Sequence, residues 1–460
     1  MTSHEFHYLT IAETAELFRS RQASPVEVTQ AILERIEVLN PRVNAFITVT
    51  AERAIKEAQQ AELAFASERD ISPLQGIPFA TKDLMYTKGI VTTAGSKILA
   101  DFVPTQNATV MEKLQHNGAV LLGKLNLLEF AMGGTMHNEH YGDTRNPWDL
   151  ERFAGGSSSG SGAAVAAGLC SAALGTDTGG SIRSPANNCG IVGLKPTYGR
   201  VSRHGVVPLS WSLDHVGPMT RTVEDCVLML QGIAGHDPKD PTSSTTPVPN
   251  YSAQLKDGVQ GLHIGLPRKH FFDNLSKEIG EAVDEVIHTF IELGAIVEEI
   301  TIEHVTSARD VYQAIVYSEA TSYHLPWLQT QSNAYGPNCR ERLESGLGLP
   351  GVAYVQAQKE RRLMSEAAQE AFAKVDLILV PGASQTPPRL NMNGSGMVAG
   401  YNNFFNIIGI PAISVPAGFT NQGLPVSIQL IGRPFDEASV LRAAYAYEQI
   451  TPWHKNHPQF

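Results

Sequence analysis

Two glycine-flanked serines, Ser157 and Ser181, are the residues of this chain best suited to chemistry. They lie 181 − 157 = 24 positions apart in the Gly-rich stretch 155–186, GGSSSGSGAAVAAGLCSAALGTDTGGSIRSPA. Glycine lets the backbone adopt conformations closed to other residues and approach a ligand closely. A flexible linker is also rich in Gly and Ser, but it has no use for the apolar run 163–169. We therefore interpret the stretch as a site that holds reactive hydroxyl groups.

A serine hydroxyl is a weak nucleophile and needs a nearby base to accept its proton. Lys82 is the candidate base, because it follows the apolar run in GIPFATKDLM (76–85) and could lie in a dry interior. A surface lysine is the ordinary alternative. At its usual pKa of about 10.4 a lysine would be roughly a thousandfold too protonated at neutral pH, but burial can lower that pKa by about 3–5 units. The hypothesis therefore requires Lys82 to be buried.

Three simpler motifs compete with this interpretation. The segment GSSSG (156–160) matches the nucleophile elbow G-x-S-x-G and would nominate Ser158, but the preceding residues 151–154 form a poor strand. The segment GAVLLGK (118–124) matches a phosphate loop, yet Leu125 replaces the Ser or Thr that would hold magnesium. The segment HNEH (137–140) lacks a third metal ligand nearby, so we expect an ordinary loop.

The Gly-rich stretch and the segment around Lys82 together resemble the amidase signature family, serine hydrolases with a Ser–Ser–Lys triad. Segments 189–225 and 423–437 also resemble this family, so the likeness runs from about residue 8 to 450. The resemblance implies that Ser181 is the nucleophile and forms an acyl-enzyme, that Ser157 is the bridging serine and follows a cis peptide bond, and that Lys82 is the base. It also implies hydrolysis of a C–N bond other than a peptide bond in a linear amide, without a metal or other cofactor.

The turn before Ser181 is expected to form an oxyanion hole. The backbone N–H groups of 178–181 (Thr178, Gly179, Gly180 and Ser181) are consecutive, and each such donor typically contributes about 3–4 kcal/mol to the transition state. Asp177 and Arg183 flank the turn, and we expect them to brace it rather than to react.

Within the family, the overall sequence is most similar to the A subunits of glutamyl-tRNA amidotransferase. Those subunits carry an acidic residue just before N-L-A-G-L-P, where this chain has Ala399 in MVAGYNNFFNIIGIP (397–411). Aromatic residues nearby predict a cavity for apolar or aryl groups instead. The expected wall residues are Met132, Gly133, Gly134, Thr135, Trp211, Tyr401 and Phe404.

We therefore predict a free-standing amidase that acts on small, fairly hydrophobic amides, anilides or carbamates. Two alternatives stay open: the glutaminase subunit of a glutamyl- or aspartyl-tRNA amidotransferase, and a carbamate (urethane) hydrolase. A ligand-binding relative without activity is disfavoured because all three triad residues are present. The partners expected with the main prediction are a small-molecule amide or carbamate and, at most, a second copy of the chain in a homodimer.

Strand-like and helix-like segments alternate along the chain and predict an α/β fold. We expect a single α/β/α domain (1–460) with a mixed central sheet surrounded by helices. Within it we expect a helical layer (1–70), a catalytic core (76–232) and a pocket or lid region (320–400) of irregular structure. The expected helices are 24–40, 51–66, 109–116, 276–293, 352–373 and 437–449. The expected strands are 77–80, 120–122, 262–266, 296–302 and 377–380, with a hairpin of 412–416 and 425–430.

The composition is that of a compact globular enzyme. The chain has 460 residues, of which 42% are hydrophobic and 18% charged. A net charge of −11 with scattered Lys and Arg argues against direct binding of nucleic acid. Four cysteines without a C-x-x-C motif indicate reduced thiols, and neither a signal peptide nor a membrane span is evident. We therefore expect a cytoplasmic protein.

Overall fold

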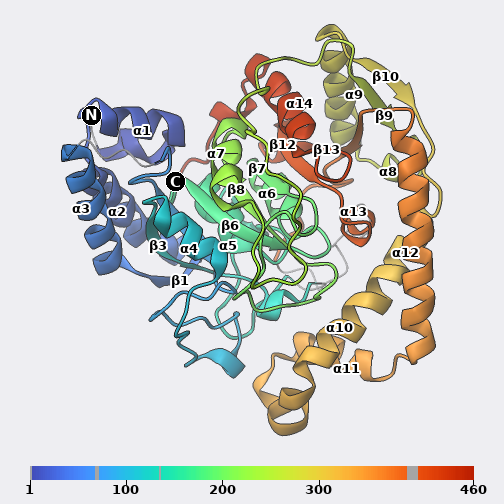
Figure 1. Ribbon diagram of the computed structural model, residues 1–460, viewed down its shortest axis with the longest axis horizontal. Coiled ribbons are helices and arrows are strands. Elements are labelled where there is room, and N and C mark those ends of the chain that lie inside the picture. The colour runs from blue at the N-terminus through green and yellow to red at the C-terminus, as the bar shows by residue number, and fades with distance from the viewer. Residues whose placement is uncertain (1–2, 68–71, 134–135, 391–401) are drawn as a thin grey trace.

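The fold is α/β, as expected, with helices surrounding a large mixed sheet (Figure 1). The structure is a computed structural model and describes residues 3–67, 72–133, 136–390 and 402–460. The main sheet has 11 strands in the order β1-β3-β2-β6-β8-β7-β12-β13-β11-β9-β10. A separate two-stranded sheet pairs β4 with β5.

The strands are short and the helices vary widely in length. The strands are β1 (Phe46–Val49), β2 (Pro78–Lys82), β3 (Val120–Leu125), β4 (Arg145–Asn146), β5 (Asp149–Phe153), β6 (Ala172–Asp177), β7 (Val192–Lys195), β8 (His215–Thr220), β9 (His263–Leu266), β10 (Ile296–Glu299), β11 (Leu377–Pro381), β12 (Ala412–Phe419) and β13 (Pro425–Ile431). The helices are α1 (Ile11–Arg19), α2 (Pro25–Val43), α3 (Ala51–Ala66), α4 (Thr109–His116), α5 (Ser159–Ala166), α6 (Arg183–Cys189), α7 (Val223–Ile233), α8 (Arg268–Phe271), α9 (Lys277–Glu292), α10 (Ala308–Gln331), α11 (Pro337–Leu347), α12 (Gly351–Phe372), α13 (Asn403–Ile407) and α14 (Glu437–Ile450).

Parallel pairing of strands brings Lys82 and the turn that leads to Ser181 to the same edge of the sheet. Strand β2 lies between β3 and β6 and runs parallel to both. Carboxyl ends of parallel strands meet at the same edge. Lys82 ends β2 and Asp177 ends β6, so Lys82 lies beside the turn that leads to Ser181.

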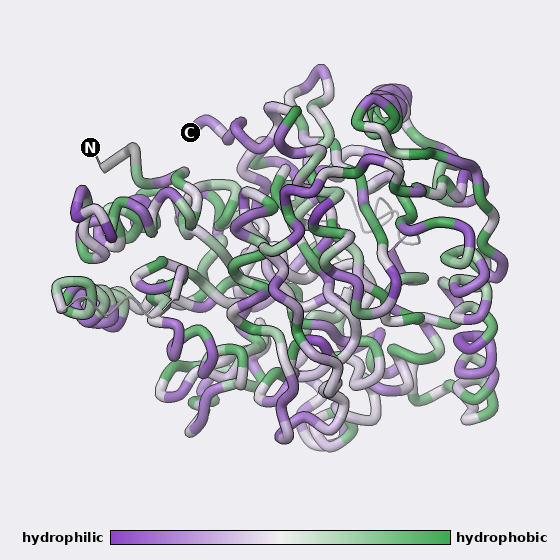
Figure 2. Tube along the Cα trace, turned by 45° about the horizontal axis from the view of Figure 1, so that its top comes forward, coloured by the Kyte–Doolittle hydropathy of each residue, from purple (hydrophilic) through white to green (hydrophobic). Residues whose placement is uncertain are grey.

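The strands of the candidate site are buried and consist mostly of apolar or small residues, apart from one charged residue in each (Lys82, Lys124 and Asp177). Every residue of β2, β3 and β6 is buried. Such runs are typical of strands covered on both faces. Figure 2 shows that the peripheral helices carry both hydrophilic and hydrophobic residues, as elements with one face in solvent do.

The N-terminal stretch contributes a strand as well as helices. Helix α2 begins with the expected capping box, in which the Glu27 amide donates to Ser24 Oγ at 3.1 Å and the Ser24 amide donates to Glu27 Oε2 at 2.8 Å. The expected end at Asn40-Pro41 is wrong. The helix continues through Pro41 and ends where Asn44 adopts a left-handed conformation (φ 55°). Strand β1 then joins the main sheet by pairing antiparallel with β3.

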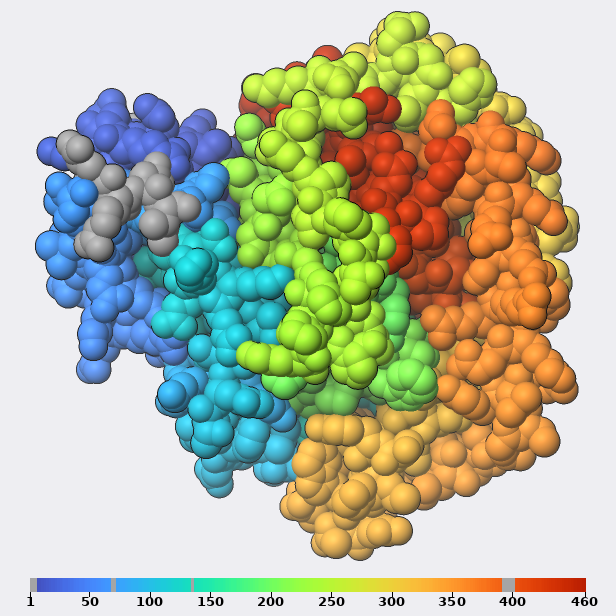
Figure 3. Space-filling model, viewed as in Figure 1, coloured from blue at the N-terminus to red at the C-terminus, as the bar shows by residue number. Residues whose placement is uncertain are grey.

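Two further expectations differ from the structure. Residues 151–154 looked like a poor strand, but β5 covers most of them and pairs with β4. The region 320–400 looked irregular, whereas its described part is largely helical and belongs to α10, α11 and α12. These three helices form an arm along one side of the molecule (Figures 1 and 3). The division into 1–70, 76–232 and 320–400 remains a prediction. No helix in the described ranges is long and apolar enough to span a bilayer.

Candidate active site

Lys82 is fully buried, as its proposed role requires. Its Nζ lies 2.7 Å from Ser157 Oγ, 3.0 Å from Ser158 Oγ and 2.8 Å from Thr176 Oγ1. All three partners are hydroxyl groups, which can both accept and donate a hydrogen bond. The geometry thus brings together Lys82 and Ser157, as the sequence predicts, and adds Thr176, which the sequence analysis did not name, and Ser158, which only the competing nucleophile-elbow motif nominated.

Two other buried lysines show how unusual this environment is. Lys124 pairs with the Asp83 carboxylate at 2.9 Å and also donates to the Met85 carbonyl and the Thr92 hydroxyl. Lys195 donates to the carbonyl oxygens of Ile410 and Pro196. Carboxylates and carbonyls only accept hydrogen bonds and so favour the protonated amine. Of these three lysines, Lys82 is the one whose hydrogen-bond partners are all hydroxyl groups and that has no carboxylate or carbonyl partner among the described hydrogen bonds.

The charge state of Lys82 follows from its burial. Burial lowers its pKa to about 7, against the opposing effect of the Asp214 and Asp177 carboxylates. A neutral amine has two N–H groups and one lone pair. The Ser158 hydroxyl already donates to the Thr176 carbonyl at 3.0 Å, so it can only accept from Lys82. The Ser157 hydroxyl can therefore point its proton at the lone pair.

Ser181 meets Ser157 through the backbone of the Gly-rich loop. The Ser157 amide donates to Ser181 Oγ at 3.2 Å. Gly156 has a φ of 51°, and a Cβ there would lie 2.8 Å from Pro185 Cδ and 3.1 Å from Ser181 Cα, so the approach needs glycine. The cis peptide bond expected before Ser157 is not found, since all described peptide bonds are trans. Left-handed conformations at Gly155 and Gly156 make the turn instead.

The candidate oxyanion hole is smaller than expected. The Gly180 amide donates to Asp177 Oδ1 at 2.7 Å and is therefore unavailable to a substrate. Among the described hydrogen bonds, none uses the N–H groups of Thr178, Gly179 or Ser181. Helix α10 closes over this turn, because a Cβ on Gly179 would lie 2.7 Å from the hydroxyl oxygen of Tyr312.

Asp177 and Arg183 hold the turn through a buried ion pair. Arg183 Nε lies 3.1 Å from Asp177 Oδ2. Burial alone would raise the pKa of Asp177, but the Arg183 guanidinium holds it well below its usual range. The same guanidinium donates to Asn402 Oδ1 (3.2 Å), Asn406 Oδ1 (2.6 Å) and Gln429 Oε1 (3.0 Å). The pair thus ties the turn after β6 to α13 and β13.

A cavity of about 310 Å³ lies over Ser181. Its walls come from the loop 131–133, the turn 179–181, the helices α10 and α11, and the segment 382–388. Met132 and Gly133 line it, at the place expected for them. Gly134, Thr135 and Tyr401 lie outside the described residues.

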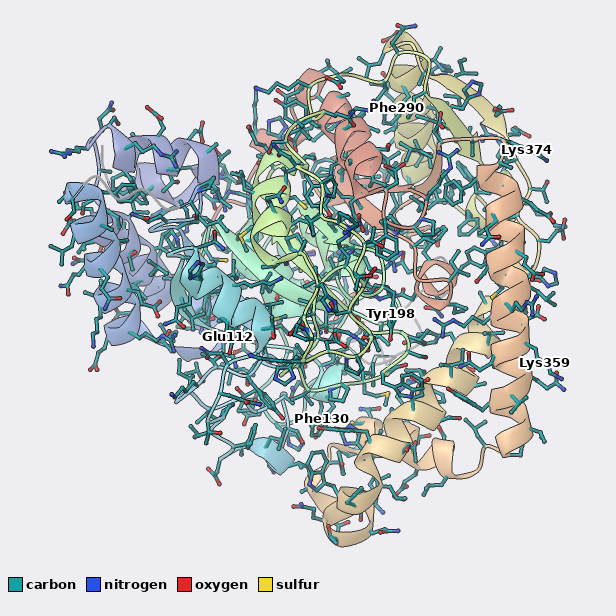
Figure 4. All side chains as sticks on the ribbon, viewed as in Figure 1. Glu112, Phe130, Tyr198, Phe290, Lys359 and Lys374 are labelled. Atoms are coloured by element: carbon teal, nitrogen blue, oxygen red, sulfur yellow. The ribbon has the colours of Figure 1, made fainter. Side chains whose placement is uncertain are left out.

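Two aromatic residues expected in this cavity lie elsewhere. Trp211 is 59% exposed and borders a second cavity, of about 510 Å³, with 203–209 and 239–242. Phe404 is fully buried, because α13 turns its ring into the hydrophobic core against Phe405. Figure 4 shows another buried ring of that core, Phe130, which contacts Trp327 and Tyr335.

Among the cavity residues that the sequence analysis did not predict are Arg309, Tyr312 and Arg342. Arg309, Tyr312 and Val316 have the spacing i, i+3, i+7 of one helix face, which could have identified them. Arg342 on α11 donates from Nη1 to the Tyr317 hydroxyl at 3.1 Å. The two arginines make the cavity cationic, in contrast to the apolar cavity that we expected.

Comparisons with known proteins agree with this geometry. A family model described as Amidase matches residues 27–441. The chain is 44% identical to the A-type subunit of glutamyl-tRNA(Gln) amidotransferase from Moorella thermoacetica, over 99% of each protein. It is 45% identical to the corresponding subunit from Geobacter metallireducens, over 98% of this chain and 99% of that protein.

The fold of this chain is also similar to the folds of solved structures. A chain from a vestigial protein complex, linked to the evolutionary origins of an s-triazine catabolic enzyme, is 35% identical with a TM-score of 0.91 and covers 96% of this chain and 98% of its own. The A-type amidotransferase subunit from Thermotoga maritima is 36% identical with a TM-score of 0.83, covering 97% and 96%. A bacterial aryl acylamidase of the amidase signature family is 27% identical with a TM-score of 0.90, covering 98% of each chain.

These relatives correct the expected partners. We expected a small-molecule substrate, no nucleic acid and, at most, a homodimer. The curated relatives are subunits of a larger enzyme, and their names specify a tRNA-linked substrate, so this expectation is wrong. The net charge of one chain carries no information about surfaces that other subunits supply.

Proposed function

Because this chain belongs to the amidase family, whose members hydrolyse C–N bonds, we propose that it is the amide-hydrolysing subunit of an amidotransferase-type enzyme in the cytoplasm. It would release ammonia from a primary amide through an acyl-enzyme on Ser181. The observation that carries this proposal is the buried Lys82 amine 2.7 Å from Ser157 Oγ, with Ser181 Oγ held beside the same residue by the Ser157 backbone amide. Identity of 44% to an amidotransferase subunit over 99% of both proteins supports the assembly.

In the proposed reaction, the proton moves between the hydroxyl groups of Ser181 and Ser157, which must meet when the substrate binds, and the Lys82 amine. Ser181 Oγ attacks the amide carbon while Ser157 accepts the Ser181 proton and passes its own proton to the neutral Lys82 amine. The carbonyl oxygen becomes an oxyanion, which the N–H groups of Thr178, Gly179 and Ser181 would stabilise. The proton then returns through Ser157 to the nitrogen of the substrate, the C–N bond breaks, and ammonia leaves. Water hydrolyses the acyl-enzyme by the same path.

The wall of the cavity favours this proposal over a free-standing amidase for hydrophobic amides. Arg309 and Arg342 bring positive charge to a site where a hydrophobic anilide would gain nothing from it. An amide donor that carries a carboxylate has a partner for that charge. No feature of the described cavity favours a carbamate over an amide.

Ammonia release tests the proposal. The purified chain, alone and with its partner subunits, is incubated with glutamine, asparagine and simple aliphatic amides. We expect ammonia from at least one primary amide, and none from Ser181→Ala. Wild-type enzyme that releases no ammonia in the presence of its partners, or a Ser181→Ala variant that retains activity, would refute it.

A further inference from the structure

We infer that the cavity over Ser181 selects amides whose far end carries a carboxylate but no ammonium group, that is, monoamides of dicarboxylic acids. This inference rests on the proposed function and names the substrate class of the same site. It depends on the charges of the cavity wall and on where Arg309 lies in the fold.

The wall of the cavity, as far as the structure describes it, carries cations and no anions. Arg309 and Arg342 line it, and none of its described lining residues is Asp or Glu. The described wall therefore offers no carboxylate to balance the charge of Arg309. A substrate carboxylate supplies one, in the planar two-pronged geometry that guanidinium favours.

An α-amino acid amide fits this wall less well. Glutamine carries an ammonium group on the same carbon as its carboxylate, so binding its carboxylate to an arginine brings a second positive charge near the cations. No acidic side chain of the described wall is present to hold that ammonium. Like charges placed together oppose binding and provide specificity against such a ligand.

Arg309 occupies the place from which it can hold the far end of the substrate. It lies in the first turn of α10, exposed at the rim, three residues before Tyr312, which packs on Gly179. These positions share a helix face, so Arg309 is displaced along the helix from the oxyanion turn. Arg342, held by Tyr317, is half-buried on the neighbouring α11. We therefore assign Arg309 as a specificity-determining residue.

The size of the cavity fits a compact ligand. Its volume of about 310 Å³ lies at the lower end of the range for small-molecule sites, about 300–1,000 Å³. A five-carbon monoamide such as glutaramate matches the backbone of glutamine without its amino group. It also keeps the carboxylate at the end of the chain, away from the amide that Ser181 attacks.

The test compares three amides of similar length that differ in charge: glutaramate, glutamine and pentanamide. The enzyme is assayed with its partner subunits. We expect kcat/KM for glutaramate to exceed that for each of the others by about tenfold or more, the factor that a modest difference in binding produces. Glutamine or pentanamide turned over as well as glutaramate would overturn the inference.

Variants of Arg309 give the second arm of the test. Arg309→Ala should raise KM for glutaramate about tenfold, with little change for pentanamide, and Arg309→Lys should recover part of the loss. Arg362→Ala, an exposed arginine on α12 outside the cavity wall, is the matched control and should change neither substrate. Equal losses for glutaramate and pentanamide in Arg309→Ala would show a structural role and overturn the assignment.

Binding separates this inference from the proposed function. Calorimetry with Ser181→Ala measures the affinity for glutaramate, glutamine and pentanamide without turnover. Preference for glutaramate that depends on Arg309 supports the inference even if no amide is hydrolysed, an outcome that would count against the proposed function alone. Equal affinities for the three amides would overturn the inference while leaving amide hydrolysis intact.

Discussion

Replacing Lys82 by methionine should abolish amide hydrolysis while leaving the fold at least as stable as the wild type near neutral pH. Methionine has nearly the length of lysine and fills the same buried space, but it cannot accept a proton. Loss of the base alone typically lowers a rate by about 10²–10⁴-fold. Because Lys82 also contacts the bridging Ser157, we expect a loss of rate near the upper end of that range.

The gain in stability follows from the cost of burying the amine. The pKa of Lys82 falls from its ordinary 10.5 to about 7 in the folded protein. A difference of about 3.5 between the two states corresponds to about 5 kcal/mol, since each pKa unit equals about 1.36 kcal/mol. Below pH 7 both states are protonated and the full cost applies. Between pH 7 and 10.5 the unfolded chain holds the extra proton, so the cost falls as pH rises, to about 2 kcal/mol at pH 9.

Methionine removes this cost but leaves three buried hydroxyl groups without their amine. Each lost hydrogen bond costs about 1 kcal/mol, which offsets about 3 of the 5 kcal/mol. We therefore expect Lys82→Met to raise the free energy of unfolding by about 2 kcal/mol at pH 6 and to lower it by about 1 kcal/mol at pH 9.

Urea unfolding of both proteins at pH 6 and pH 9, followed by circular dichroism, measures this difference, and ammonia release measures activity. Lys82→Arg is the matched control, because arginine keeps the positive charge at both pH values and should be both inactive and destabilised. At each pH, the free energy of unfolding of wild type is subtracted from that of Lys82→Met. If this difference is smaller at pH 6 than at pH 9, the reasoning is refuted.

Three further predictions concern the same site. The kcat/KM of the wild type should be level above about pH 8 and fall about tenfold per unit below pH 7, because protonation of Lys82 removes the base; a pH–rate profile that is flat from pH 5 to 9 would contradict this. Thr176→Val removes an acceptor 2.8 Å from the Lys82 amine, so the acidic limb of that profile should move to lower pH, and a shift to higher pH would show that this hydroxyl does not stabilise the ammonium. Gly179→Ala should lower kcat at least tenfold while the thermal midpoint changes little, because the added Cβ meets Tyr312 at 2.7 Å and displaces the oxyanion turn; unchanged kcat would place the oxyanion elsewhere.

The sequence predicted correctly those features that one residue type or one local pattern determines, such as the bounds of a helix or the burial of a side chain. Helix α3 and helix α4 have the bounds that periodicity predicts, and the burial of Lys82 follows from the apolar run before it. Aromatic residues were placed wrongly, because a Phe that faces the core and a Phe that lines a cavity look alike in a sequence. Only the packing of α13 decides that Phe404 is core.

The cavity could not be predicted because its wall is assembled from distant segments. Arg309 and Arg342 belong to α10 and α11, two helices that the sequence analysis did not predict. The sequence also does not show which backbone N–H groups of the turn are free to bind an oxyanion. Gly180 looks like an oxyanion donor until the carboxylate of Asp177 is seen to engage its amide, which depends on the geometry of one turn.

The network around Arg183 bears on when this protein becomes active during its synthesis. The guanidinium that braces the nucleophile turn finds its acceptors at Asn402, Asn406 and Gln429. A nascent chain that has emerged only as far as residue 390 already contains both serines and the lysine, yet it lacks the partners that complete the turn. We expect such ribosome-bound chains to be inert, so that no amide is consumed before nearly the whole polypeptide has left the ribosome.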